Sequence, residues 1–309
     1  MATRDDIVTD VTTLLGTDPH LSTAEIQTLV QLRYSHLYDT FLWSRRLRDF
    51  TISTVAQVSS TTSDTVTVTN ASATVTSAGT PFTSAMTDRQ IALGDMPGYL
   101  FLTYVSTSEI TLHDGEGTAV TWPGDTESGV SWRIFNTLYS LPLDADAVLS
   151  IGSDIALVEV DGGRGTLDEW DPERETTADP VTHWCYAGVT GAAGRRKIEV
   201  WPTPSAARIL RGQYARSVPT LGASTVIEFN RALLVYAAAA DCLGMLYAKT
   251  GDESYKETGL FYERKSRELE ADIKPREQER LSLPTSIGRG PRRLGADFYV
   301  DHQDMAGEG

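Results

Sequence analysis

Histidine and cysteine supply many metal ligands and nucleophiles, and this sequence has few of them, widely spaced. His183 and Cys185 lie two positions apart, so on a β-strand both would point to one side and could supply half of a zinc site. No further pair is spaced to complete it, and ordinary strand residues are the better interpretation. Cys242 is also isolated. We therefore expect two buried free thiols, no metal and no cofactor.

Three short segments carry groups that could bind ligands. DGGRG at residues 161–165 is glycine-rich like a phosphate loop, but no helix start follows it, so we expect a solvated turn. HDGEG at residues 113–117 has oxygen atoms suited to calcium but lacks the rest of an EF-hand. LDEWDPERE at residues 167–175 places Trp170 between acids, as a sugar site would, although a solvated acidic loop is the better explanation.

The sequence lacks the usual signatures of catalysis. It has no Gly-x-Ser-x-Gly elbow, no phosphate-binding loop ending in Gly-Lys-Ser/Thr, and no cysteine-protease context. Acid–base hydrolysis needs two carboxylates at a fixed separation, and among 42 acidic residues no pair stands out. We expect no enzymatic activity.

Acidic charge is concentrated in the middle of the chain. The net charge is −15, and residues 136–180 contribute −9 of it, from 11 acidic and 2 basic side chains. Residues 181–309 carry +2, from 18 basic and 16 acidic side chains. A protein that grips nucleic acid shows the reverse, a basic stripe. The charge therefore indicates either plain solubility or a surface that lies near DNA without holding it.

No apolar run of about 18 residues predicts a membrane span. The first residues also lack the basic and then apolar pattern of a secretory signal. We expect a protein made in a reducing cytosol, with no membrane partner.

The elements that must position these residues begin with a helical hairpin. An apolar stripe from Ile7 to Leu15 predicts a first helix over about residues 4–15. Ser22 and Glu25 form a capping box that opens a second helix.

Helix returns near the other end of the chain. Asn230 can cap a helix that is apolar on nearly every side, which predicts burial on several sides, and Gly251 marks its end. Asp252 opens a charged last helix that Pro275 ends or kinks.

From Phe50 the hydrophobic period changes from that of a helix to that of a strand. Turn residues separate short candidate strands, and such spacing predicts a small barrel or sandwich. The threonine-rich stretch TVTVTNASATVTS opens it, because threonine favours strands. The candidate strands are residues 50–58, 65–69, 72–76, 89–93, 99–105, 109–112 and 130–135.

Residues 138–221 predict a second β region with long acidic connections. THWCYAG, RRKIEVWPTP and ARILRGQYARSVPTL are typical of three strands. Pro202 and Pro204 would make the turn of a hairpin that joins residues 198–201 to residues 209–214.

Beyond Leu281 the chain is polar and rich in glycine and proline, so it is either disordered or an arm that docks on a neighbour. Its cations Arg289, Arg292 and Arg293 could bind nucleic acid or an acidic neighbouring subunit, and an aromatic pair, Phe298 and Tyr299, follows.

Three stretches together resemble the head-to-tail adaptor (connector) proteins of tailed bacteriophages. They are TVTNASATVTSAGTPFTSAMTDRQIAL at residues 67–93, KIEVWPTPSAARILRGQYARSVPTL at residues 197–221, and ALLVYAAAADCLGMLYAKTGDESY at residues 232–255. With the opening hairpin they cover most of the chain. These are patterns of turns and apolar residues rather than of reactive groups.

The resemblance implies an α+β fold: a helical-bundle core, an inserted small β-barrel or sandwich, and an extended C-terminal arm. Residues 1–49 and 136–280 would form the core, residues 50–135 the insert, and residues 281–309 the arm. It further implies a virion protein assembled in the host cytoplasm. About twelve copies would form a ring beneath the portal that extends the DNA channel and docks a tail, nozzle or fibre protein.

On this interpretation two groups of residues would carry the function. Acidic residues would face the channel, so that DNA slides without sticking; these are Asp144, Asp146, Asp161, Asp168, Glu169 and Asp171. Contacts with the portal or with neighbouring subunits would come from Arg289, Arg292, Arg293, Phe298, Tyr299, Leu233, Tyr236, Tyr255 and Tyr262.

Two other classes of protein remain open. A carbohydrate-binding or adhesin-like protein would use Trp122 or Trp132 beside the Ser/Thr strands as a sugar platform. A glycosidase would need one essential carboxylate pair.

Overall fold

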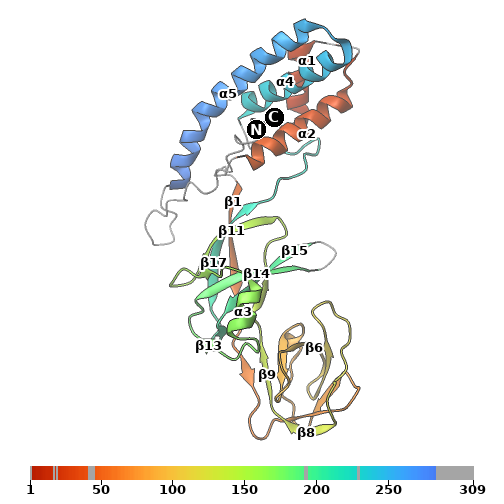
Figure 1. Cartoon of the computed structure of the whole chain (residues 1–309), viewed down its shortest axis with the longest axis vertical. Helices are drawn as coiled ribbons and strands as arrows, with labels where there is room; N and C mark the ends of the chain where they lie inside the picture. The colour runs from red at the N-terminus through yellow and green to blue at the C-terminus, as the bar shows by residue number, and fades with distance from the viewer. Residues whose placement is uncertain are drawn as a thin grey trace, which may run out of the picture. The chain divides into compact units, whose positions relative to one another are not determined.

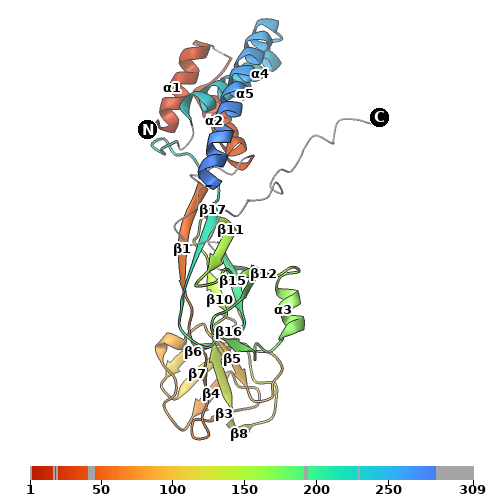
Figure 2. The same cartoon turned by 90° about the vertical axis from the view of Figure 1, so that its left-hand side faces the viewer.

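The computed structural model describes residues 2–16, 18, 20–40, 46–190, 194–227 and 230–282. Their contacts divide into two compact units (Figures 1 and 2). The helical unit is built from Met1–Leu47 and Ser217–Gly309, and the β unit from Arg48–Arg216. The β unit is therefore inserted between the second helix of the helical unit and the last two.

The helical unit contains α1 (Arg4–Leu15), α2 (Thr23–Asp39), α4 (Arg231–Thr250) and α5 (Glu253–Ser282). The predicted helix starts are confirmed. The Ser22 hydroxyl accepts a hydrogen bond from the Glu25 backbone N–H while the Glu25 carboxylate reaches back to Ser22, and Asn230 caps α4. Gly251 ends α4 in the left-handed conformation. Pro275 does not end α5, which continues to Ser282.

Helix α4 is the centre of this unit. Its Leu, Val and Ala side chains are buried against residues of α1, α2 and α5, so burial on several sides is confirmed. By length and hydropathy alone this helix could cross a membrane, and half of its most apolar stretch is buried within the fold. Ion pairs from Arg33 to Asp241, Arg231 to Asp10 and Lys249 to Glu25 tie it to α2 and α1.

Helix α5 packs through a narrow stripe. Every third or fourth residue along it is buried or half-buried, the spacing of a coiled-coil seam. At Gly259 a Cβ atom would lie 3.4 Å from the Leu243 Cβ, so the small residue lets the two helices approach closely. The stripe comprises Tyr255, Gly259, Tyr262, Ser266, Leu269 and Ile273.

One part of the β unit consists of two sheets that share a hydrophobic core. Three strands form the order β1–β17–β11 and four form β10–β15–β14–β12, and their apolar side chains share a cluster that includes Phe50, Trp184 and Ile198. Helix α3 (Arg164–Trp170) and the short pair β13–β16 complete this region. The bounds are β1 Leu47–Ser53, β17 Ile209–Arg216, β11 Ala145–Gly152, β10 Leu138–Ser140, β15 Arg195–Trp201, β14 His183–Thr190, β12 Val158–Glu159, β13 Thr177–Ala178 and β16 Thr203–Pro204.

The rest of the β unit is one eight-stranded sheet that surrounds a second core (Figure 1). Its threonine-rich start forms the predicted hairpin, in which Thr67 pairs with Thr76. Fully buried residues alternate with a half-buried one along β3, as a period of two requires, whereas all four residues of β5 are buried. In sheet order the strands are β2 Val58–Ser59, β9 Trp132–Phe135, β5 Gln90–Leu93, β6 Leu100–Ser106, β7 Glu109–His113, β4 Thr74–Ser77, β3 Val66–Val68 and β8 Glu127–Val130.

The predicted helical-bundle core is wrong, although the structure is α+β. Extensive sheets, one of eight strands, make up the larger part of the fold. Residues 136–216, which the adaptor resemblance places in the core with the helices, belong to the β unit, because the apolar residues of β11, β14, β15 and β17 are buried against other strands.

Two local predictions are also wrong. Strands β15 and β17 lie in different sheets and form no hairpin; Pro202 and Pro204 lack the N–H groups that a tight ladder would use, and the chain crosses between sheets there. A helix does follow the glycine-rich segment: α3 begins at Arg164, after Gly163.

Acid should weaken the link between α4 and α2. Hydrogen bonds from Lys249 and Ser22 lower the pKa of Glu25 from about 4.5 to about 2. A carboxylate with a lowered pKa stabilises the fold above its ordinary pKa, and this contribution is lost as the pH falls toward 2. We expect Lys249→Met to unfold at a lower temperature than the wild type near neutral pH, and the difference to close as the pH falls from about 4.5 to about 2.

The measurement is thermal unfolding of the full chain, followed by circular dichroism across that pH range. Lys265→Met is the matched control, because Lys265 makes only an exposed i,i+3 pair with Glu268 on α5. A difference between Lys249→Met and wild type that stays constant with pH would contradict the assignment.

Candidate functional surfaces

The interface residues predicted in the helical unit have mostly structural contacts. Leu233 is 1% exposed and fills the core, so its assignment to an interface is wrong. The half-buried rings of Tyr236 and Tyr262 stack with centroids 5.8 Å apart, and the Tyr255 hydroxyl donates to Asp18 over 2.6 Å. These tyrosines attach α5 to the rest of the unit.

The predicted contact residues of the arm, Arg289, Arg292, Arg293, Phe298 and Tyr299, lie outside the described residues. Their assignment stays a prediction.

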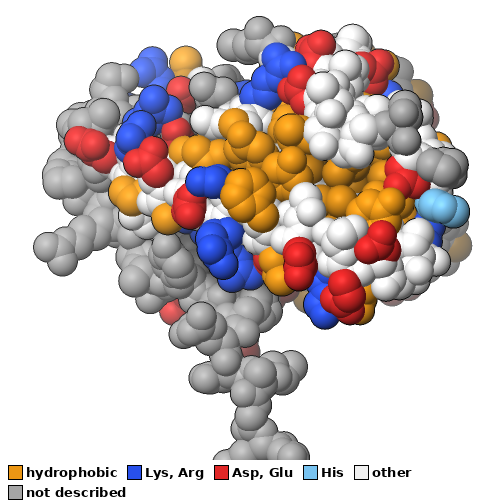
Figure 3. All heavy atoms as spheres, turned by 90° about the horizontal axis from the view of Figure 1, so that it is seen from above, with side chains coloured by type: hydrophobic (Ala, Val, Ile, Leu, Met, Phe, Trp, Pro, Cys, Tyr) orange, Lys and Arg blue, Asp and Glu red, His pale blue; other side chains and the backbone are white. Residues whose placement is uncertain are grey.

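Other apolar side chains on the helices are exposed. Leu32 on α2 is 60% exposed, and on α5 Leu260 and Phe261 are 57% and 53% exposed. Figure 3 shows apolar side chains gathered across one face of the helical unit and bordered by charges of both signs. Exposed apolar patches on soluble proteins commonly mark binding surfaces. The sequence signal for the exposed apolar side chains of α5 is the run Leu260-Phe261.

The six predicted channel-facing acids fall into three groups. Asp161 and Glu169 are exposed, and their carboxylates form no ion pair with any described residue. Asp146 pairs with Arg196, Asp168 pairs with Arg174, and Asp144 accepts a hydrogen bond from Tyr214, which leaves these three only partly available to solvent contacts.

Asp171 is the exception, because it is 5% exposed. Its carboxylate accepts hydrogen bonds from the backbone N–H groups of Glu175 and Thr176 and from the Trp201 indole. These bonds lower its pKa in spite of burial. Asp171 stabilises the loop after α3 and does not face a channel, so this assignment is wrong.

The most buried charges of the β unit surround Glu199 on β15, whose side chain is fully buried. Its Oε1 atom accepts from the Thr137 hydroxyl over 3.1 Å. Thr137 in turn exchanges two hydrogen bonds with the Gln90 side chain on β5: its N–H donates to Oε1 over 2.8 Å, and its hydroxyl accepts from Nε2 over 2.9 Å. The chain of bonds joins the eight-stranded sheet to the four-stranded one.

Arg174 neutralises Glu199 from the loop after α3. Its Nε atom lies 2.7 Å from Glu199 Oε1, and both side chains are fully buried. Its other nitrogen atoms bond the Asp168 carboxylate and the carbonyl groups of Leu167 and Asp171. Burial alone would lower the pKa of Arg174, but Glu199 and Asp168 outweigh it and raise this pKa.

A second cation completes the network. Arg164 Nε on α3 lies 3.4 Å from Glu199 Oε2, and the same guanidinium donates to the Tyr99 hydroxyl beside β6. Burial and the nearby Glu199 raise the pKa of Tyr99. Glu199 Oε2 accepts no hydrogen bond from any described residue, and its one charged neighbour there is Arg164. We interpret the network as structural, because its centre has no access to solvent. Its sequence signal was a glutamate between two apolar residues in KIEVW.

The two tryptophans predicted as sugar platforms are buried, and a different group of aromatic side chains forms a cluster. Trp122 and Trp132 are 7% and 3% exposed and donate to backbone carbonyls, so they cannot stack on a sugar. Trp170, His183 and Trp201 form a cluster with ring centroids 5.6–5.7 Å apart, in which Trp170 is half-exposed.

Both cysteines are free and buried, as predicted. Burial raises the pKa of Cys185 to about 11 and that of Cys242 to about 12, so neither is a reactive thiolate. Within the described residues, His, Cys, Asp and Glu side chains form no group of three that could hold a metal ion.

Compared with models of known protein families and with the sequences of curated proteins, the chain matches none.

Breaking the Arg174–Glu199 pair should destabilise the β unit strongly. We expect Arg174→Met to lower the free energy of unfolding by about 3–5 kcal/mol, because it leaves a buried carboxylate without its nearest cation. The double variant Arg174→Met/Glu199→Met should lose less than the single variant. Urea unfolding followed by tryptophan fluorescence measures both.

Arg208→Met is the matched control. Arg208 also bonds an aspartate, Asp179, through two nitrogen atoms, but this pair is at the surface. We expect Arg208→Met to change the free energy of unfolding little. If Arg174→Met and Arg208→Met lowered the free energy of unfolding equally, burial of the Arg174–Glu199 pair would not explain its contribution to stability.

Proposed function

We propose that this chain is the ring-forming subunit of a head-to-tail adaptor of a tailed bacteriophage, with a structural and not a catalytic role. The observation that carries the proposal is the exposure of apolar side chains on α2 and α5, in a chain whose net charge is −15. An acidic protein of this size gains nothing in solubility from Leu32, Leu260 and Phe261 at more than half exposure, whereas a subunit interface would bury them.

The placement of these side chains suits a head-to-tail contact between copies. Leu32 lies on α2, and Leu260 and Phe261 lie on α5, and both helices pack against α4. We propose that Leu32 of one copy contacts Leu260 and Phe261 of the next. Such a heterologous interface closes into a ring when the rotation between copies permits. We propose about twelve copies, the number that the family resemblance implies.

The acidic residues support a channel that does not hold DNA. Asp161 and Glu169 are exposed and carry charge that no described residue neutralises. Carboxylates in a channel repel phosphate groups, so DNA would pass without being retained. We propose that the ring binds the portal on one side and a tail, nozzle or fibre protein on the other.

Ring formation should depend on the apolar residues of α5. We expect Leu260→Ser/Phe261→Ser to raise the concentration at which rings form by at least about tenfold, because burying each side chain is worth about 1.5–3 kcal/mol. Mass photometry over a concentration series, with negative-stain microscopy of the same samples, measures this on the full chain.

Leu143→Ser is the matched control, because Leu143 is 59% exposed but lies in the β unit. We expect it to form rings like the wild type. A double variant that assembles like the wild type, or a wild-type chain that assembles only into closed dimers, would contradict the proposed interface.

A further inference from the structure

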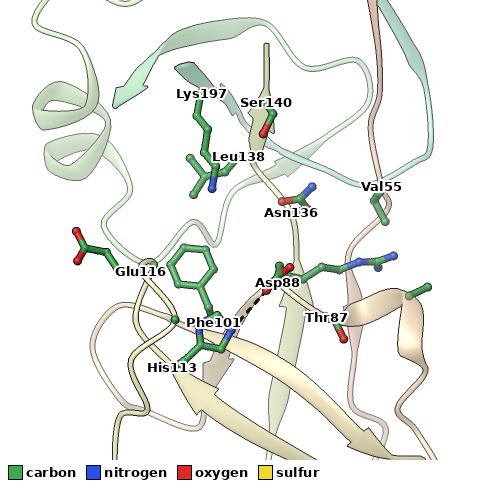
Figure 4. A pocket seen from close by; sticks show the side chains of 14 residues that line it. Val55, Thr87, Asp88, Phe101, His113, Glu116, Asn136, Leu138, Ser140 and Lys197 are labelled. Atoms are coloured by element: carbon green, nitrogen blue, oxygen red, sulfur yellow. Dashed lines mark ion pairs between the residues drawn. The ribbon is translucent and has the colours of Figure 1, made fainter. Parts of the chain in front are cut away.

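A polar cleft of about 570 Å³ opens within the β unit (Figure 4). One wall comes from the eight-stranded sheet, through the segment before β5, strand β6 and the end of β7 with the loop after it. The other wall comes from β10 and β15. The volume lies in the range of small-molecule sites, so the cleft has room for a ligand of one or two rings.

Charges of both signs line this cleft in equal number. The acids are Asp88 and Glu116, and the cations are Arg89 and Lys197. The formal charges of these four side chains cancel, so the cleft favours neither a net positive nor a net negative ligand. A charged ligand would lose its hydration there without a net attraction in return.

Neutral donors and acceptors lie between the charges. In Figure 4 Asn136 and Ser140 follow one strand beside Lys197, and Ser140 pairs with Lys197 across β10 and β15. The side chains of Asn136, Ser140, Arg89 and Lys197 form no hydrogen bond or ion pair with any described residue. Their hydrogen-bonding groups are therefore available to a ligand.

The buried ring of His113 faces the same cleft. It is 8% exposed, its Nδ1 atom lies 2.5 Å from the Asp114 carbonyl oxygen, and its Nε2 atom has no hydrogen-bond partner among the described residues. Asp88 Oδ1 lies 3.8 Å from Nε2, which is an ion pair when the ring is protonated but is too long for a hydrogen bond. A hydroxyl group donates to a neutral Nε2 and accepts from a protonated one, so it suits this atom in either state. A second hydroxyl on the adjacent carbon of a sugar can donate to Asp88.

Packing and hydrogen bonds hold the cleft in shape. The Phe101 ring stacks on His113 at 5.9 Å between centroids, and a Cβ atom at Gly115 would lie 3.3 Å from the Phe101 ring. Gln90 and Thr137, each next to a lining residue, join the two walls by hydrogen bonds. A pocket that does not need to close costs little conformational entropy on binding.

We infer that this cleft binds a neutral saccharide of one or two sugar rings. Arg89 and Lys197 donate to its oxygen atoms, and Asp88 and Glu116 accept hydrogen bonds from its hydroxyl groups. The half-buried Phe101 ring adds an apolar contact for its C–H groups. Every hydroxyl both donates and accepts, so one uncharged ligand can satisfy acids, cations and amide together.

Other small ligands satisfy fewer of these groups. A sugar acid or an inorganic anion brings a negative charge next to Asp88 and Glu116, and the anion has no hydroxyl groups to offer them. An amino acid carries one charge of each sign, but these are joined through a single carbon. It would engage one acid and one cation and leave the side chains of Asn136 and Ser140 without a partner.

The test is a titration of the full chain, with the ring resonances of its five histidines observed by NMR. The neutral probes are glucose, galactose, maltose and lactose, and the charged probes are sodium glucuronate and glycine. The resonance that is absent from His113→Gln identifies His113. We expect at least one neutral probe to shift this resonance with saturation and to bind at least about tenfold more tightly than glucuronate or glycine.

Salt separates recognition by hydroxyl groups from recognition by charge. We expect the affinity for the neutral probe to change less than about twofold between low and high salt, because the ligand has no charge to screen. The absence of a saturable shift with all four neutral probes would overturn the inference. Equal or tighter binding of glucuronate or glycine, or a strong loss of affinity with salt, would also overturn it.

Variants locate the site. Asn136→Leu keeps the size of the side chain but removes its donor and acceptor, so it should weaken binding of the neutral probe at least about threefold. Lys197→Met provides an independent test on the other strand, with the same expected loss. Lys265→Met on α5 is the matched control and should bind like the wild type. Unchanged affinity in folded Asn136→Leu and Lys197→Met would show that the saccharide binds elsewhere and would overturn the site.

Discussion

A carboxylate with no access to water organises the β unit. Glu199 lies on a strand of the four-stranded sheet, and its charge is balanced by Arg174 and approached by Arg164. Through Thr137 it also reaches Gln90 in the eight-stranded sheet. Since an isolated buried charge costs several kcal/mol, the sheets and α3 must keep the positions that pair it.

The two units differ in the surfaces that they present. In the helical unit, α1, α2 and α5 pack against α4 and form one hydrophobic core. Apolar side chains on α2 and α5 are nevertheless exposed. The β unit has excess acidic charge at its surface, and its two fully buried charges, Arg174 and Glu199, pair with each other. The ring subunit that we propose needs both properties, an apolar contact surface and a surface that does not retain DNA.

Features set by neighbouring residues could be predicted from the sequence, whereas contacts between residues far apart in the sequence could not. The capping groups of Ser22 and Asn230 act within one turn, so both helix starts follow from the sequence. Strand positions followed from a period of two, but their partners did not, which is why β15 and β17 were wrongly joined. Thr137 and Glu199 are 62 residues apart, so nothing near KIEVW indicates what the glutamate meets. The sequence also does not show that Leu260 and Phe261 are exposed, because apolar residues on an amphipathic helix usually pack against the core.

Electron microscopy of the full chain mixed with a portal protein encoded in the same genome tests the proposed role most directly. The account predicts a ring of the chain bound coaxially to the portal, with the apolar residues of α2 and α5 buried between neighbouring copies. A chain that stays monomeric in the presence of the portal, or a ring whose copies meet only through their β units, would contradict it.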